Sequence, residues 1–290
     1  MCDERTVRDA SDYLNRARLT RREFGKLSAG AGLAMLLPRA ANAQAIAEST
    51  VMVTTPDGVA DCHFVHPASG ASPAVLVWPD ILGLRPAFEQ MGRRLAESGY
   101  AVLTVNPFYR NARAPVVPEG ASFQDEATRN TVFPLAQSLS PETHVTDARA
   151  FIAWLDQQDA VDTSRPVGTT GYCMGGPITM RTAATAPDRV GAAASFHGGG
   201  LVTDGPDSPH LLVPQMRAGY LFAIAENDDR DDPEAKNVLR NAFDQAGLNA
   251  EITVFTAQHG WCPPDSAVYD EEDAERAWAR LLFLFGRDLA

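Results

Sequence analysis

The chain has 290 residues and a formal net charge of −12, and 45% of its residues are apolar while 21% are charged. This ordinary globular composition excludes disordered, collagen-like and coiled-coil proteins, and the acidic balance argues against a nucleic-acid partner, whose phosphates would be repelled. The length allows one large α/β domain or two small ones. No apolar run reaches the roughly 18 to 20 residues of a transmembrane helix, so we expect no stable membrane anchor.

The first segment, residues 1–43, has the organisation of an export signal. A charged stretch contains the pair Arg21-Arg22 followed by x-Phe, a short and weakly apolar stretch comes next, and an Ala-x-Ala site ends at Ala43. The arginine pair resembles a twin-arginine signal, although a surface helix that carries two arginines is the alternative. We expect recognition by the twin-arginine export machinery, cleavage after Ala43, and a periplasmic or secreted mature chain of residues 44–290.

The mature segment alternates strands and helices without a repeat or an internal linker. Short alternating runs around Pro56-Asp57-Gly58 predict an antiparallel hairpin, and continuous apolar runs predict strands that are buried on both faces. Such alternation predicts a single α/β domain with a doubly wound, mostly parallel sheet and helices on both faces. In chain order we expect strands over 51–54, 60–65 and 74–78, a helix over 86–98, a strand over 101–105, a helix over 140–158, a strand over 167–170, a helix over 177–185, strands over 191–196 and 220–225, a helix over 232–246, a strand over 251–255 and a helix over 270–286.

The longest irregular stretch, residues 107–139, is polar and contains a short predicted helix after Asp125. A connection of this length is usually a functional loop or a cap. It ends at Ser140-Pro141-Glu142, which predicts a helix start with Ser140 as the N-cap, proline in the first position and an acid in the first turn.

A glycine-rich turn, Gly171-Tyr172-Cys173-Met174-Gly175, joins a predicted strand to a predicted helix. This is the context of a nucleophile elbow, in which the turn is so tight that only glycine fits two residues from the nucleophile. The helix N-terminus favours the thiolate form of the cysteine. The alternatives are a buried structural cysteine and a phosphate-binding loop, although neither a Walker A motif nor Gly-x-Gly-x-x-Gly is present.

Two later loops supply a candidate acid and a candidate base. α/β-hydrolases place their triad in the chain order nucleophile, acid, base. Asp228 follows the strand over 220–225, and His259 follows the last predicted strand. Both therefore lie at the carboxyl ends of strands, where doubly wound sheets carry their active sites. Among the neighbouring acids, Asp232 is better interpreted as an N-cap.

The sequence shows no cluster of metal-ligating residues, and we expect neither a metal ion nor another cofactor. The pair His63 and His66 has no cysteine or acid at ligand spacing, and we interpret it as lying along a strand edge.

Together these motifs resemble the dienelactone hydrolase family of α/β-hydrolases. The resemblance covers about residues 50–287 and implies the α/β-hydrolase fold and the hydrolysis of a small-molecule ester or lactone. The motifs that carry it are the segments 75–84, 171–176, 226–228 and 259–261.

The resemblance also implies roles for residues outside the triad. The family has an acid, usually Glu, after its first central strand that helps to activate the cysteine; Asp80 matches it, although Asp80 could equally be a turn residue. The backbone N–H groups of Ile81 and Met174 would form the oxyanion hole. Of two arginines that bind the substrate carboxylate in the enzyme acting on dienelactone, one matches Arg129, and the other would fall at Pro263.

The implied reaction is a two-step acyl transfer. Cys173 attacks the carbonyl carbon, His259 acts as acid and base, Asp228 orients His259, and water then releases the acid. Tyr172 and Trp261, which adjoin the motif residues, are further candidate substrate-binding residues.

Two other functions fit the same residues. One is a non-catalytic binding module, because a fold does not determine a function. The other is a redox protein in which Cys173 is the sensor and Cys262 the resolving cysteine; three cysteines in the mature segment allow at most one disulfide. His197 and the three glycines after it resemble the lipase oxyanion motif but follow the nucleophile, so we interpret them as a glycine-rich loop.

Overall fold

The computed structural model describes residues 4–17, 37–38 and 43–290. The predicted twin-arginine pair, Arg21-Arg22, lies outside the described residues. Within those residues, no helix combines the length and the apolar character that a membrane crossing requires.

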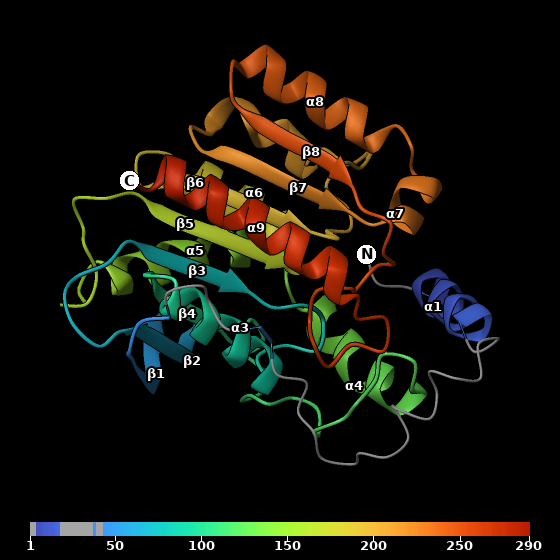
Figure 1. Cartoon of the computed structure of the whole chain (residues 1–290), viewed down its shortest axis with the longest axis horizontal. Helices are drawn as coiled ribbons and strands as arrows, with labels where there is room; N and C mark the ends of the chain where they lie inside the picture. The colour runs from blue at the N-terminus through green and yellow to red at the C-terminus, as the bar shows by residue number, and fades with distance from the viewer. Residues whose placement is uncertain (1–3, 18–36, 39–42) are drawn as a thin grey trace.

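An eight-stranded mixed sheet forms the centre of the molecule (Figure 1). Its spatial order is β1-β2-β4-β3-β5-β6-β7-β8. β2 pairs antiparallel with β1 and with β4, and the remaining neighbours pair parallel, which confirms the mostly parallel sheet. The strands are β1 (Ile46–Thr55), β2 (Gly58–Pro67), β3 (Ala74–Trp78), β4 (Ala101–Val105), β5 (Val167–Tyr172), β6 (Val190–Phe196), β7 (Gly219–Ile224) and β8 (Ala250–Val254).

Helices pack on both faces of this sheet (Figure 1). One face carries α3 (Pro86–Glu97) and α9 (Glu271–Asp288), and the other carries α5 (Pro141–Leu155), α6 (Gly175–Thr185) and α8 (Ala235–Ala246). Each helix buries an apolar stripe: in α3, Phe88, Met91 and Leu95 recur at helical spacing and pack on the sheet. The other helical segments are α1 (Glu4–Ala17), α4 (Glu126–Gln137), the 3₁₀ helix η1 (Pro209–Gln215) and α7 (Glu226–Asp231).

The start of α5 agrees with the sequence prediction, but the segment around Asp232 does not. Ser140 caps α5, because its hydroxyl accepts the Thr143 N–H at 3.3 Å while the Thr143 hydroxyl accepts the Ser140 N–H at 2.8 Å. Asp232, predicted as the N-cap of a helix that ends near Ala246, instead follows the short helix α7, and α8 begins at Ala235 after Glu234. Asp232 has φ −139° and ψ 78°, a non-helical conformation that suits a residue before proline.

Candidate active site

Cys173 lies in a sharp turn between the end of β5 and the start of α6. Its φ is +51°, in the left-handed region that side chains other than glycine rarely occupy, and such a residue stores about 1 to 3 kcal/mol of strain. A Cβ at Gly171 would lie 2.1 Å from the Gly175 carbonyl oxygen, and one at Gly175 would lie 2.3 Å from the Trp78 carbonyl oxygen. Only glycine fits at these two positions, so the structure has the elbow geometry that the glycine spacing predicts.

The oxidation state of the cysteines determines whether Cys173 can react as a thiolate. Cys173 is disulfide-bonded. Cys62 and Cys262 are free and buried, and burial raises the pKa of both thiols. Cys262 therefore does not act as a resolving cysteine for Cys173 in this structure, contrary to the redox alternative. Nucleophilic attack by Cys173 requires the reduced protein.

His259 and Asp228 form a close pair at the carboxyl ends of the strands. The His259 ring contacts both Asp228 oxygens through Nδ1, at 3.0 and 2.8 Å, and its backbone N–H donates to the Asn227 side-chain oxygen at 2.7 Å. With Nδ1–H donated to the carboxylate, Nε2 of the neutral ring is the basic nitrogen. His259 and Cys173 line one cavity of about 80 Å³, which brings the predicted nucleophile and base together.

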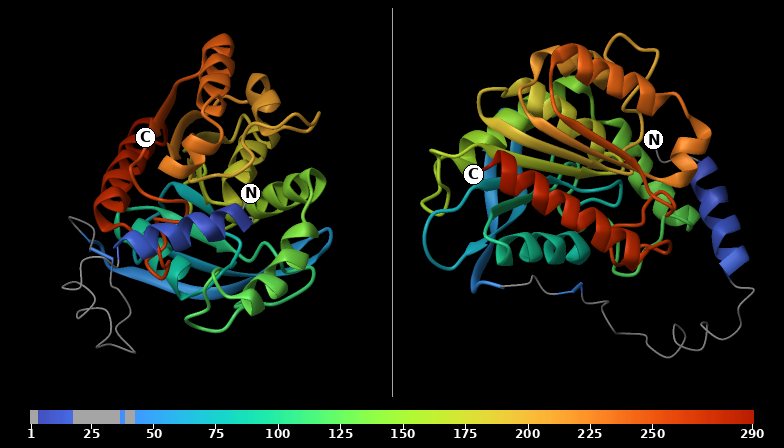
Figure 2. Two further views of the ribbon diagram at one scale, coloured as in Figure 1. Left: turned by 90° about the vertical axis from the view of Figure 1, so that its right-hand side faces the viewer. Right: turned by 45° about the horizontal axis from the view of Figure 1, so that its top comes forward.

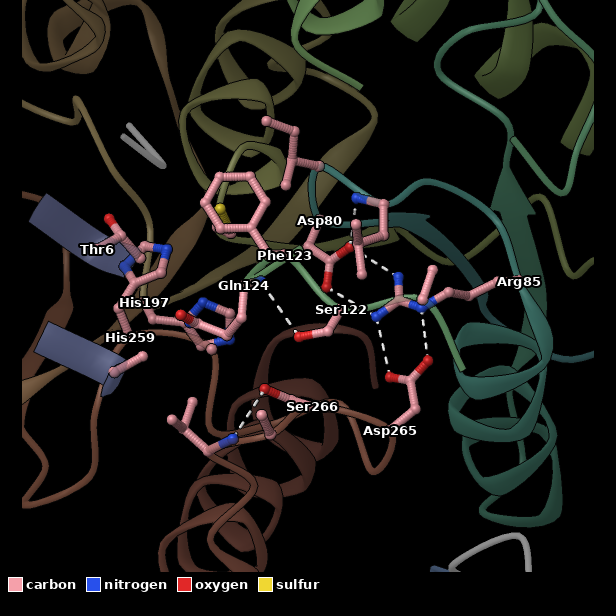
Figure 3. A pocket seen from close by; sticks show the side chains of 18 residues that line it. Thr6, Asp80, Arg85, Ser122, Phe123, Gln124, His197, His259, Asp265 and Ser266 are labelled. Atoms are coloured by element: carbon pink, nitrogen blue, oxygen red, sulfur yellow. Dashed lines mark hydrogen bonds and ion pairs between the residues drawn. The ribbon is translucent and has the colours of Figure 1, made fainter. Parts of the chain in front are cut away.

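The Asp80 carboxylate is held by a buried arginine (Figure 3). Arg85 donates to its two oxygens at 2.7 and 3.0 Å, and the Leu82 N–H donates at 2.9 Å. Arg85 also donates twice to Asp265, at 2.7 and 3.0 Å; although burial opposes it, the two carboxylates raise the pKa of Arg85. These hydrogen bonds hold the loop after β3 in place, and that loop positions Ile81 beside the cavity. Activation of the thiol by Asp80 stays a prediction.

The two proposed oxyanion donors flank Cys173. Met174 is the residue before α6, and Ile81 lies in the loop after β3. Neither backbone N–H donates a hydrogen bond to a described residue. Two uncommitted N–H groups beside a nucleophile are what an oxyanion hole requires.

Arg129 positions a loop and does not line the cavity. Its guanidinium donates from one nitrogen to the carbonyl oxygens of Phe123 and Gln124, at 2.9 and 2.6 Å. These two residues line the cavity with Cys173. Arg129 therefore acts on the site indirectly in this structure, and substrate binding by Arg129 stays a prediction.

The expectation that Tyr172 and Trp261 contact substrate needs correction. Tyr172 is 3% exposed and stacks on Phe196 at 5.0 Å, on the side of β5 covered by α3. Trp261 is fully buried and stacks on Phe255 at 5.4 Å. Both rings belong to the core beneath the site. Tyr172, the last residue of β5, directly precedes Cys173, and successive side chains at a strand end point to opposite sides.

His197 is a site residue that the sequence interpretation missed. It has φ +39° and is fully buried, with its ring 5.1 Å from that of His259 and 5.0 Å from that of Trp261. Burial, and then the neighbouring His259, lower the pKa of His197 well below its usual value, so the ring is neutral. Its position after β6, at the carboxyl edge of the sheet, is the signal that could have identified it.

Helix α1 lies over the cavity of Cys173, beside α7 (Figure 2). Thr6 and Ala10 are among the lining residues, and Thr6 adjoins His197 and His259 in Figure 3. The Arg230 guanidinium of α7 donates to Asp9 at 2.8 Å. A segment predicted to leave with the export signal thus forms part of the wall of this cavity.

The predicted strand-edge histidines have protein partners. His63 Nε2 contacts Glu48 at 2.9 Å, and His66 Nδ1 contacts the Pro67 carbonyl oxygen at 2.8 Å. In the part of the chain that the structure describes, no group of three or more His, Cys, Asp or Glu side chains is arranged to hold a metal ion.

Comparison with known proteins identifies relatives in sequence and in structure. The carboxymethylenebutenolidase of Pseudomonas sp. strain P51 is 26% identical over 227 residues, covering 78% of this chain and 89% of its own. That of Pseudomonas putida is 25% identical over 219 residues, covering 74% of this chain and 86% of its own. The dienelactone hydrolase-like promiscuous phosphotriesterase P91 from metagenomic libraries has the same fold, with a TM-score of 0.70, 22% identity, and coverage of 85% of this chain and all of that one.

The family comparison covers most of the chain. The model of the dienelactone hydrolase family matches residues 61–289, from β2 to the end of α9. With the eight-stranded sheet and the strand–turn–helix at Cys173 already described, this match assigns the fold. The chain therefore belongs to the dienelactone hydrolase family and is a lactone or ester hydrolase with the α/β-hydrolase fold.

Proposed function

We propose that the chain cleaves small-molecule carboxylic esters or lactones through a covalent acyl-enzyme on Cys173. The observation that carries the proposal is one cavity lined by both Cys173, at a strained elbow, and His259, whose Nδ1 is held by Asp228 at 2.8 Å. A nucleophile, a base and an orienting acid are the parts that acyl transfer requires.

The proposed reaction has two halves. The Cys173 thiolate adds to the carbonyl carbon, and the oxyanion accepts hydrogen bonds from the N–H groups of Ile81 and Met174. The C–O bond then breaks, and the leaving alkoxide takes a proton from the His259 imidazolium, which Asp228 stabilises. Water next gives a proton to His259 and attacks the thioester, which releases the carboxylic acid and restores the thiolate.

The test uses the full chain reduced with dithiothreitol, because Cys173 is disulfide-bonded. A panel of p-nitrophenyl esters and lactones should be hydrolysed, and acid-quenched protein should carry the acyl mass on Cys173. Cys173→Ala should abolish turnover, and Asp228→Asn should lower kcat by roughly 10²- to 10⁴-fold. Cys262→Ala is the matched control, since that thiol is free and buried away from the cavity.

Two outcomes would contradict the proposed mechanism. Turnover that survives Cys173→Ala would show that Cys173 is not the nucleophile. Saturable binding of esters by the reduced wild type without any turnover would identify a binding module.

We also propose that the twin-arginine machinery exports the chain to the periplasm or the medium. The support is the sequence of residues 1–43, with Arg21-Arg22 before an apolar stretch and an Ala-x-Ala site. Replacing both arginines with lysine should leave an uncleaved precursor in the cytoplasm, detected by fractionation and N-terminal sequencing. Unchanged export, with an N-terminus still at Gln44, would contradict the twin-arginine assignment.

A further inference from the structure

A second and larger cavity adjoins the proposed oxyanion donors. Its volume is about 740 Å³, compared with about 80 Å³ for the cavity at Cys173 and His259. Ile81 lines both cavities, and Met174 lines the larger one. A volume of this size is typical of sites that bind small organic molecules, so the larger part of a substrate has space here.

The orientation of a bound ester follows from the position of His259. His259 lines the small cavity and not the large one. Because His259 delivers the proton to the leaving group, the alcohol part belongs in the small cavity. The acyl part then extends past Met174 into the large cavity.

The walls of the large cavity are mostly apolar. They come from α4, the start of α5, the first turns of α6 and the segment 199–209 after β6. The apolar lining includes Phe133, Ala136, Leu139, Met174 and Pro177. An apolar acyl chain would gain about 25 cal/mol for each Å² removed from water here.

A buried cation also lines this cavity. Arg181 is 8% exposed, and its Nη2 donates at 2.9 Å to the Asp207 carbonyl oxygen. Among the residues that the structure describes, no carboxylate forms an ion pair with Arg181. Burial lowers the pKa of Arg181, but a guanidinium keeps its charge in proteins. The acids nearest to it, Glu142 and Asp207, are exposed, so water and salt screen their charges.

A second polar group lies beside this cation. Both ring nitrogens of His144 are buried and have no hydrogen-bond partner among the described residues. Burial, followed by the charges of Arg181 and Arg110, lowers the pKa of His144 to about 3, against the weaker opposing charge of Glu142. The ring is therefore neutral and has one N–H to donate. A buried cation and an unused donor in one cavity are complementary to an anion.

The spacing along α6 gives the length of the ligand. Met174, Pro177 and Arg181 line the cavity at helical spacing on one face. Seven residues of helix span about 10 Å, and a long side chain reaches back toward the helix N-terminus. An anion at Arg181 therefore lies roughly 5 to 10 Å from the oxyanion donors, the length of about four to eight carbon atoms.

We propose that the large cavity binds the acyl chain of the substrate and that Arg181, together with His144, holds a carboxylate at the far end of that chain. The proposal rests on the ester hydrolysis proposed above and specifies its substrate class: esters of dicarboxylic acids with an apolar chain of about four to eight carbons.

The test compares two chromogenic esters of equal chain length. The reduced full chain is assayed with p-nitrophenyl hydrogen octanedioate, which ends in a carboxylate, and with p-nitrophenyl octanoate, which does not. The ratio of kcat/KM for the two esters should fall roughly 10- to 100-fold in Arg181→Met, because a hydrogen bond to a charged group is lost, and Arg181→Lys should restore part of it. Arg240→Met, which removes an exposed arginine of α8, is the matched control and should leave the ratio at its wild-type value.

Two further variants keep the proposal testable if Arg181→Met does not fold. His144→Phe keeps the ring volume but removes the N–H, and it should lower the same ratio about 3- to 10-fold. Ala136→Phe fills part of the cavity and should lower kcat/KM for both eight-carbon esters relative to p-nitrophenyl acetate. An unchanged ratio in folded Arg181→Met and His144→Phe would overturn the carboxylate site. If the wild type hydrolyses no ester at all, the proposed hydrolysis itself fails.

Discussion

Replacing Asp80 with asparagine separates a structural from a catalytic role for the carboxylate beside the nucleophile. The Asp80 side chain is 12% exposed and that of its partner Arg85 is 6% exposed. Asparagine keeps the size of the side chain but removes the charge that faces the guanidinium. Arg85 keeps its second partner, Asp265, whose side chain is 40% exposed.

The size of the effect follows from this difference in burial. Removing one partner of a buried ion pair lowers the free energy of unfolding by about 3 to 5 kcal/mol. Because Asp265 remains as a partner of Arg85, we expect a loss of about 3 kcal/mol for Asp80→Asn. At about 2 to 4 °C per kcal/mol for a domain of this size, Tm should fall by about 6 to 12 °C. Asp265→Asn weakens hydrogen bonds to Arg85 that are as short as those of Asp80, but Asp265 is partly exposed to solvent. This change should therefore lower the free energy of unfolding by about 1 kcal/mol or less.

The assay is thermal unfolding of both variants, with kcat/KM measured on the same preparations well below either Tm. If Asp80 also activates Cys173, the folded Asp80→Asn protein should lose roughly 10²-fold or more in kcat, and Asp80→Glu should retain or raise activity on a lactone. If Asp80 only holds the loop, activity per folded molecule stays normal. Equal Tm shifts in Asp80→Asn and Asp265→Asn would refute the reasoning from burial.

Other expectations concern the elbow, the thiols and the N-terminal segment. Gly175→Ala should cost roughly 1 to 3 kcal/mol or more in unfolding experiments, since its Cβ would lie 2.3 Å from a backbone oxygen; Gly286→Ala, with nothing within 4 Å, should be neutral or stabilising. Iodoacetamide should label Cys173 in the reduced native protein well before Cys262, because Cys173 shares a cavity with His259 whereas burial raises the pKa of the Cys262 thiol, and equal labelling by peptide mass spectrometry would contradict this. Deleting residues 1–43 should raise kcat/KM of the reduced protein by up to about tenfold, since apparent affinity scales with the open fraction, and an unchanged value would show that α1 does not restrict the site.

Much of the fold and the core of the site could be predicted from sequence because the determining interactions are local. The glycines around Cys173 act within a few residues, where a Cβ would strike the neighbouring backbone. Apolar runs mark the buried strands, and parallel strands bring their carboxyl ends to one edge. That rule placed Asp228 and His259 near each other, and the structure joins them at 2.8 Å.

The helix boundary at Asp232 shows the limit of local rules. Consecutive acids before Pro233 suit both a helix start and a helix end. The residue was assigned to the start of a single helix, whereas the structure has two helices with Asp232 between them. The conformational restriction before proline does not separate the two, because an N-cap residue and a residue before proline are both non-helical.

The sequence by itself determined the order of the candidate site residues along the chain: a cysteine in a glycine-bounded turn, then an acid, then a histidine. Only the tertiary structure decided what surrounds them. Arg85, which pairs with Asp80, also pairs with Asp265, 180 residues later in the sequence, and His197 lies against His259 from a different strand end. Such pairings depend on how helices and loops pack over the sheet, and side-chain packing of distant segments leaves no periodic pattern in the sequence.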